Sequence, residues 1–114
     1  MDDLKEKKCK PCEGDIDPLT VNQSKELLRL IDKAWVLSED GKTIERRFSF
    51  PVYSRTIAFV NAVVWIAHNQ NHHPKLIVAY GYCDVQYSTH AIDGLSENDF
   101  ICAAKIDQLV TESD

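Results

Sequence analysis

The sequence predicts an α+β domain in which three helices pack on one face of a four-stranded antiparallel sheet. Three observations support this prediction. Apolar residues recur at helical spacing in three segments, two pairs of strand-like segments separate these helices, and each pair is joined by a turn-forming sequence. Hairpins that alternate with amphipathic helices are typical of this layered class. The expected order of elements is α-ββ-α-ββ-α.

Length and composition indicate one small domain. A chain of 114 residues can bury a single modest core, and 44% hydrophobic with 27% charged residues is ordinary for a globular protein. We expect residues 1–18, which are charged and contain prolines and a glycine, to form an extended N-terminal arm. Residues 19–114 should form the domain. The net charge of −5 argues against direct binding of nucleic acid.

The sequence shows no signal for export or membrane insertion. Its most apolar stretch, residues 57–67, is about half as long as the roughly 20 residues that cross a bilayer. The cysteines are therefore expected to be reduced thiols in the cytoplasm. Cys9 and Cys12 form a C-x-x-C pair but lack the further ligands of a zinc site. We expect them to do no chemistry, with structural metal binding as the remaining alternative.

The first half of the domain is predicted to contain a helix and a hairpin. Thr20 and Gln23 fit a capping box, and apolar residues at helical spacing then predict a helix over residues 20–33. A Ser-Glu-Asp-Gly turn sequence at residues 38–41 separates two strand-like segments. The second of these alternates apolar and polar residues from Ile44 onwards, as a half-buried strand does.

A second helix is predicted over residues 54–70, with Ser54 as its N-cap and Trp65 in the core. Trp35, just before the first hairpin, is expected in the core as well. Pro74 disfavours helical geometry in the residue before it, so the helix should end near this point. Two adjacent histidines then lie at the C-terminal end of the helix, where the helix dipole favours an imidazolium.

The last part of the chain is predicted to contain a second hairpin and a third helix. A Gly-Tyr pair suits a two-residue turn between two β-rich segments. If Tyr80 pairs with Cys83 across this turn, His90 falls opposite His73 on the neighbouring strand. A Ser-x-x-Asp capping pattern then starts a helix that runs to about residue 111.

The histidines are the candidates for chemistry, because three of the four lie within residues 68–73 and the predicted hairpin adds His90. Such a group could bind a metal, activate a nucleophile or transfer protons. The side chains of adjacent residues diverge, and no H-E-x-x-H motif is present, which argues against a metal. No serine or cysteine lies in a recognisable nucleophile elbow. Proton transfer requires the fewest partners, because imidazole titrates near neutrality.

A wider pattern surrounds these histidines: His72-His73-Pro74 is followed by Tyr80, His90 and Asp99, with a Gly-Leu-Ser-Glu sequence before the aspartate. This pattern resembles the signature of the pterin-4a-carbinolamine dehydratase family. The resemblance covers about residues 9–110 and includes the Cys-x-Pro-Cys-Glu-Gly start that some members have. It implies the same order of helices and strands that the elements above predict.

The resemblance also implies an activity. Members dehydrate 4a-hydroxytetrahydropterin, which aromatic amino acid hydroxylases release, to quinonoid dihydropterin, and this hydro-lyase reaction requires no metal or cofactor. By motif position, His73 and His90 are the implied acid/base groups. His72 is implied as a pterin-orienting or second acid/base group. Asp99 is expected either to support the site or only to cap the third helix.

Two positions depart from the family pattern. His68, a possible pocket residue together with Tyr80, stands where relatives often have Glu, and Asn98 stands where animal members tend to have Arg. The alternative function is therefore a non-enzymatic dimerisation or assembly module that retains the fold. Animal members also act as dimerisation cofactors for a homeodomain transcription factor. For this chain we expect a homodimer or homotetramer, formed through an open sheet edge.

Overall fold

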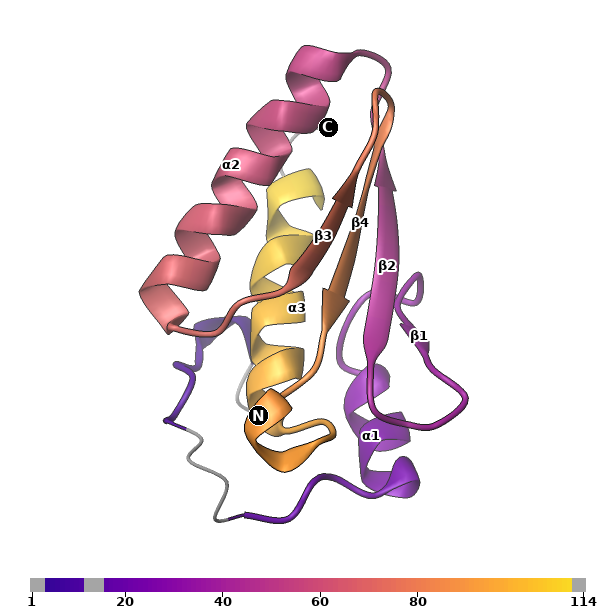
Figure 1. Cartoon of the computed structure of the whole chain (residues 1–114), viewed down its shortest axis with the longest axis vertical. Coiled ribbons are helices and arrows are strands. Elements are labelled where there is room, and N and C mark those ends of the chain that lie inside the picture. The colour runs from indigo at the N-terminus through magenta and orange to yellow at the C-terminus, as the bar shows by residue number, and fades with distance from the viewer. Residues whose placement is uncertain (1–3, 12–15, 112–114) are drawn as a thin grey trace.

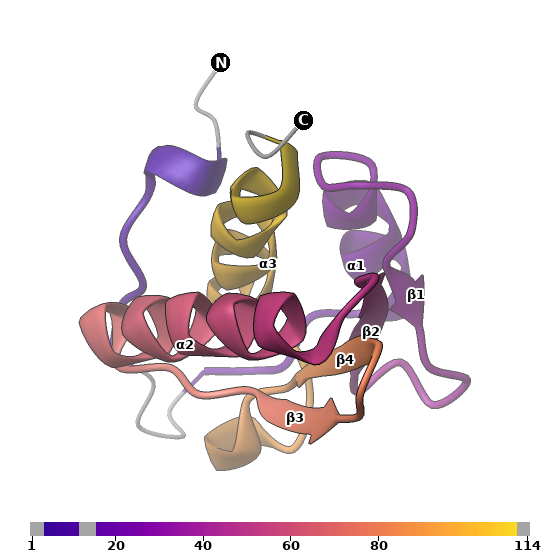
Figure 2. The same cartoon turned by 90° about the horizontal axis from the view of Figure 1, so that it is seen from above.

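The structure, a computed structural model, describes residues 4–11 and 16–111. Its elements are η1 (Leu4–Glu6), α1 (Val21–Leu28), β1 (Val36–Leu37), β2 (Ile44–Ser49), α2 (Tyr53–Gln70), β3 (Lys75–Val78), β4 (Tyr82–Tyr87), η2 (His90–Ile92) and α3 (Glu97–Thr111). The strands form one antiparallel sheet in the order β1-β2-β4-β3. The three α-helices lie on one side of this sheet (Figures 1 and 2). The predicted α+β class and order of elements are confirmed.

The core lies between the sheet and helices α2 and α3. Phe48 of β2 and Val85 of β4 face the helices and belong to one buried cluster with Phe59, Val63 and Phe100. Each large apolar side chain buried in this way contributes roughly 1.5–3 kcal/mol. Helix α2 ends at the same end of the molecule at which α3 begins (Figure 1). This packing brings the residues after α2 close to the first turn of α3.

Helix α1 is shorter than predicted, because it ends at Leu28 rather than near residue 33. The predicted capping box is present at its start. Beyond Leu28 the backbone hydrogen bonds change from the α-helical i→i−4 pattern to i→i−3, as from the Leu30 amide to the Leu27 carbonyl (2.9 Å). The Asp32 amide then donates to the carboxylate of Asp107 on α3 (3.0 Å). This contact with α3 draws the chain out of the helix, which the local sequence could not reveal.

Helix α2 begins one residue earlier than predicted, at Tyr53. Its N-cap is Val52, which has no side-chain oxygen to accept a hydrogen bond, so the prediction that Ser54 is the cap is wrong. The Thr56 hydroxyl instead lies 2.8 Å from the Tyr80 carbonyl oxygen, to which it donates. The hairpin turn therefore anchors the first turn of this helix.

The prediction that Trp65 lies in the core is wrong, whereas Trp35 is buried as expected. Trp65 is 64% exposed, because it lies about 200° around the helix from Val63, which faces the core. The buried positions of α2 are Thr56, Phe59, Val63 and Ala67. Helix α2 is thus amphipathic rather than buried on all sides.

The hairpin of β3 and β4 has a different register from the predicted one. Val78, not Tyr80, pairs with Cys83, and the Ala79 amide donates to the Tyr82 carbonyl (2.9 Å) across a turn formed by Tyr80 and the following glycine. The two-residue shift leaves every side chain on its predicted face, because side chains alternate with a period of two. The predicted pairing of His90 with His73 therefore does not occur, and the register of this hairpin does not by itself place His90 near the histidine pair.

The N-terminal segment differs from the predicted extended arm. Leu4 of η1 is 5% exposed and belongs to the core cluster. Residues 7–11, which we call the strap, continue past α3 to the end of α2. Apolar burial at Leu4 and contacts of the strap hold a segment whose charges and prolines suggested poor order. In the described residues, no helix is long and apolar enough to cross a membrane.

Candidate functional site

The end of α2 determines where the histidine pair lies. Asn71 follows the helix in the left-handed conformation (φ 50°). Its amide donates to the His68 carbonyl (3.2 Å), and the His72 amide donates to the Ala67 carbonyl (3.1 Å). These two bonds form a Schellman motif, which closes the helix and reverses the chain. The residues after Asn71 are thereby directed from α2 towards α3 and β4.

His72 is held by a buried carboxylate. Its Nε2 lies 2.6 Å from Oδ1 of Asp99, which is fully buried on α3. The other oxygen, Oδ2, accepts hydrogen bonds from the Thr89 hydroxyl (2.8 Å) and from the Ser96 amide (3.0 Å). Asp99 therefore caps α3 and binds His72 at the same time. Because a carboxylate only accepts hydrogen bonds, Nε2 of His72 carries a proton whether the ring is neutral or charged.

Tyr87 supports the other side of this histidine, a contact that sequence reasoning missed. The two rings are stacked with centroids 5.4 Å apart, and the Tyr87 hydroxyl donates to the His72 carbonyl (3.3 Å). Burial raises the pKa of Tyr87, so its hydroxyl stays protonated as a donor. The only signal in the sequence was a tyrosine on the inward face of β4. Nothing distinguished it from an ordinary core residue.

The surroundings of His72 favour its charged form. Burial lowers the pKa of His72, but the hydrogen bond to Asp99 and the charge of that carboxylate outweigh it. The net result is a pKa above the ordinary value for histidine. With 13% of its side chain exposed, His72 is a constrained imidazole that tends to carry a positive charge.

His72, His73 and His90 all border one cavity of about 470 Å³. Both His73 and His90 are exposed to it. The remaining lining residues come from the strap, the end of α2, the segment from the end of β4 into η2, and the start of α3, and they are Cys9, Lys10, Pro11, Gln70, Asn71, Ser88, Thr89, Ala91 and Asn98. A volume of this size is within the range of small-molecule sites. The structure thus brings together the three histidines that the sequence singled out.

His90 reaches the cavity by a route that differs from the predicted one. It lies in η2, after β4 has ended, rather than on a strand opposite His73. Thr89 and Gly94 pair across this loop, with the Thr89 amide donating to the Gly94 carbonyl (2.8 Å). A side chain at Gly94 would lie 2.6 Å from Cβ of Pro18, so only glycine fits there. The tight loop turns His90 towards the histidine pair.

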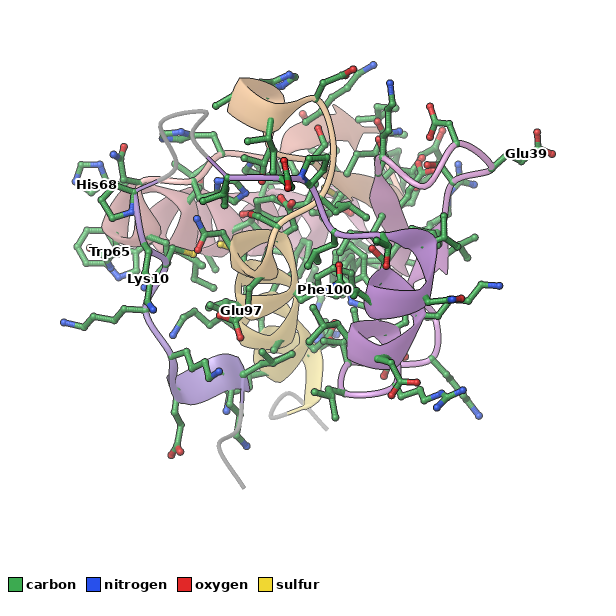
Figure 3. The ribbon with its side chains drawn as sticks, turned by 90° about the horizontal axis from the view of Figure 1, so that it is seen from below. Lys10, Glu39, Trp65, His68, Glu97 and Phe100 are labelled. Carbon is green, nitrogen blue, oxygen red and sulfur yellow. The ribbon has the colours of Figure 1, made fainter. Side chains whose placement is uncertain are left out.

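Neither His68 nor Tyr80 lines this cavity. His68 lies on the outer surface of α2, with its ring 6.2 Å from that of Trp65 (Figure 3). It borders a second groove of about 270 Å³, which is formed with Val64 and Leu76 and shares His73 with the cavity. Tyr80 is 65% exposed at the hairpin turn and stacks on Tyr53, so it is not a wall of this cavity.

The strap forms one wall of the cavity, and Asn98 holds it in place. The side-chain oxygen of Asn98 accepts from the Lys10 amide (3.0 Å), and its side-chain nitrogen donates to the Lys10 carbonyl (2.6 Å). The Cys9 amide donates to Oε1 of Gln70 at the end of α2 (2.8 Å). Sequence reasoning missed this wall because it treated the segment as an arm. Within residues 4–11 and 16–111, no group of three or more acidic, histidine or cysteine side chains is placed to hold a metal ion.

Comparison with known proteins identifies the family. The sequence profile described as pterin 4 alpha carbinolamine dehydratase matches residues 17–109. The chain belongs to this pterin-4a-carbinolamine dehydratase family. The resemblance found in the sequence is therefore confirmed.

Curated relatives from several bacteria extend over almost the whole chain. A Nitrosospira multiformis protein is 56% identical, with 96% of this chain and 94% of the relative covered. Proteins of Nitrosomonas europaea (51% identical, 94% of this chain and 93% of the relative) and Legionella pneumophila (50%, 96% and 97%) are similar to the same extent. All three are provisionally named pterin-4-alpha-carbinolamine dehydratases.

Solved structures support the same fold. A transcriptional coactivator/pterin dehydratase from Brucella melitensis has a TM-score of 0.76 at 30% identity, covering 82% of this chain and 98% of that chain. A pterin dehydratase-like protein identified as a RuBisCO assembly factor in the alpha-carboxysome has a TM-score of 0.58 at 22% identity, covering 67% and 88%. At that identity the second comparison concerns the fold alone.

Proposed function

We propose that this protein is a hydro-lyase that dehydrates 4a-hydroxytetrahydropterin to quinonoid dihydropterin. The observation that supports it best is the convergence of His72, His73 and His90 on one cavity, with His72 bound to the buried Asp99. Membership of the dehydratase family and the names of the bacterial relatives point to the same chemistry. The reaction would be one step in recycling the hydroxylated pterin that an aromatic amino acid hydroxylase releases.

The reaction requires one proton to leave and another to arrive. The bond between C4a and the hydroxyl oxygen breaks, N5 loses its proton, a double bond forms between N5 and C4a, and water departs. An imidazole can accept the N5 proton while an imidazolium protonates the leaving hydroxyl. Groups that titrate near neutrality are suited to both steps. No redox change occurs, so histidines alone can supply the catalysis.

The three histidines are suited to different roles. His73 and His90 are exposed in the cavity and can meet a bound substrate, so we assign the two proton transfers to them. His72 is held by Asp99 and tends to be protonated, so we assign it to orienting the pterin or to acting as a second acid. Asp99 is then a positioning residue, because it acts through His72.

The test is a coupled assay in which an aromatic amino acid hydroxylase generates 4a-hydroxytetrahydropterin and its decay is followed by ultraviolet absorbance. The protein should accelerate the decay, and His73→Ala and His90→Ala should each lose about 10²–10⁴-fold in rate, as expected when a general acid or base is removed. His68→Ala, a histidine outside the cavity, is the matched control and should keep its activity. A wild-type protein that leaves the decay rate unchanged would exclude the dehydratase.

A non-enzymatic assembly module is the second outcome that this experiment can reveal. It predicts that wild-type protein is inactive and that His73→Ala binds its protein partner as well as wild type does. A dehydratase predicts that the same variant is folded but inactive. Circular dichroism and partner pull-down on wild type and His73→Ala separate these outcomes.

We also propose that the protein is a cytoplasmic homo-oligomer that pairs through the edge strand β3. This strand is at the end of the sheet and exposes Ile77 and Val78, and unpaired edges of this kind can pair with a second copy. Light scattering that finds only monomer at micromolar concentration would contradict the assembly. Cell fractionation that recovers the protein outside the cytoplasm would contradict the location.

A further inference from the structure

Two cysteines from distant parts of the sequence meet beside the histidine cavity. The Sγ atoms of Cys9 in the strap and Cys102 in α3 lie 3.5 Å apart, although 93 positions separate the residues. A disulfide bond requires about 2.05 Å, so the two atoms need to approach by roughly 1.5 Å. Neither cysteine is engaged in a disulfide in this structure. The local sequence gave no indication that these residues are partners.

The two thiols differ in a way that suits a reactive thiol and a second, resolving thiol. Cys9 is partly exposed and lines the cavity, whereas Cys102 is fully buried. The hydrogen bond from Cys102 lowers the pKa of Cys9, against the opposing effect of burial, and the positive charge of His72 lowers it further. The same bond and burial raise the pKa of Cys102. A small oxidant that enters the cavity would therefore meet the thiol that ionises more readily.

We propose that Cys9 and Cys102 form a reversible dithiol–disulfide site in the wall of the histidine cavity, with a hydroperoxide as the oxidant. The Cys9 thiolate attacks the terminal peroxide oxygen, the O–O bond breaks, and Cys9 becomes a sulfenic acid while an alkoxide or hydroxide leaves and is protonated. The Cys102 thiol then attacks the Cys9 sulfur, the S–S bond forms, and the sulfenic oxygen leaves as water. Overall the two thiols lose two electrons and two protons, and the peroxide is reduced. A dithiol reductant reverses the change by exchange.

The bond would fix the strap against α3. At present the strap wall depends on hydrogen bonds from the Cys9 amide to Gln70 and between Lys10 and Asn98. A covalent link at Cys9 should slow opening of this wall, so hydrogen exchange at the Cys9 and Lys10 amides should slow on oxidation. The free thiol of Cys9 near His72 would also be lost. These effects do not depend on pterin turnover, and their test is independent of the proposed dehydratase activity.

The test treats full-length reduced protein with equimolar hydrogen peroxide at neutral pH and maps disulfides by mass spectrometry without reduction. Chymotrypsin separates Cys102 from Cys83, because it cuts after Phe100. Cys12, which lies outside the described residues, stays on one peptide with Cys9, so Cys12→Ser is used as the parent protein. We expect a peptide that links Cys9 to Cys102, and an intact mass lower by two hydrogen atoms, both reversed by dithiothreitol.

Three variants make the result specific. In Cys9→Ser the link should be absent, and Cys102 should remain an unoxidised thiol. In Cys102→Ser, Cys9 should accumulate as a sulfenic acid that dimedone traps. Cys83→Ser is the matched control, because it alters a buried thiol outside the pair and should still form the link. A link between Cys9 and Cys83, a link formed only between molecules, or a parent protein that keeps all its thiols would each overturn the proposal.

Discussion

The two oxygens of Asp99 connect the start of α3 to the histidine site. One accepts from the Ser96 amide and the Thr89 hydroxyl, and the other binds His72. An aspartate that only capped the helix would need a single partner at the helix start. The extra bond explains why the pKa of His72 is raised although the imidazole is mostly buried.

Replacing Asp99 by Asn should lower the pKa of His72. The variant keeps the size of the side chain but removes the negative charge that offsets burial. Nuclear magnetic resonance titration of the imidazole measures this directly, and the variant should lose about 1–3 kcal/mol of stability as a charged hydrogen bond is lost. Asp93→Asn is the control, because Asp93 is exposed and its left-handed conformation suits Asn. An unchanged titration of His72 in Asp99→Asn would contradict the account.

The same pair should make stability depend on pH. Because folding raises the pKa of His72, its contribution is fully present below the unfolded value of about 6.5 and is lost as pH rises through the folded value. Urea denaturation across this window should show wild type losing stability relative to His72→Gln as pH increases. If the free energy of unfolding of wild type relative to His72→Gln stays constant or increases as pH rises, the predicted sign is wrong.

Among the elements, the end of α2 depends on one left-handed residue. Asn71 at φ 50° should tolerate glycine, whereas Asn71→Ala keeps a Cβ in this conformation without the short polar side chain that lets asparagine adopt it, at a cost of about 1–2 kcal/mol. Chemical denaturation should therefore rank Asn71→Gly at or above wild type and Asn71→Ala below it. If alanine and glycine variants are equally stable, the Schellman motif does not fix the histidine pair.

The start of the same helix offers the opposite case, an unused cap. Val52 has the extended geometry of an N-cap but no acceptor, so Val52→Ser should stabilise the protein by about 0.5–2 kcal/mol. The denaturation midpoint measures this, and Val52→Ala, which removes the same apolar surface without adding an acceptor, is the comparison. Equal midpoints for the serine and alanine variants would show that no cap forms.

For the whole molecule, the two sheet edges differ in their capacity to pair. The edge strand β1 has two residues, whereas β3 has four and is flanked by an apolar groove. Ile77→Lys should dissociate the proposed oligomer by placing a charge on β3, and Val36→Lys on β1 should leave it intact. Sedimentation velocity distinguishes these results. Dissociation by the β1 variant alone would place the interface at the other edge.

The sequence predicted features that depend on local patterns and missed those that depend on distant contacts. Helical spacing and turn sequences predicted the order of elements, and the family resemblance singled out the three histidines that border the cavity. The early end of α1 depends on Asp107, 75 positions from the amide it accepts from, and no local pattern contains that information. The stacking of Tyr87 and the wall at Cys9 were missed for the same reason. Trp65 was misplaced because α2 carries apolar residues outside its buried face as well, so its sequence does not show which face meets the core.

The partnership of the strap with α3 has a consequence for the order of folding. Lys10 and Asn98, which close one wall of the cavity, are 88 positions apart, and contacts of such separation form late because a long loop must first close. During synthesis, the strap therefore has no surface to bind until α3 has emerged and packed on the sheet. The sheet and α2 can assemble before this point, but a ligand that needs the complete cavity can bind only after the most distant segments have met.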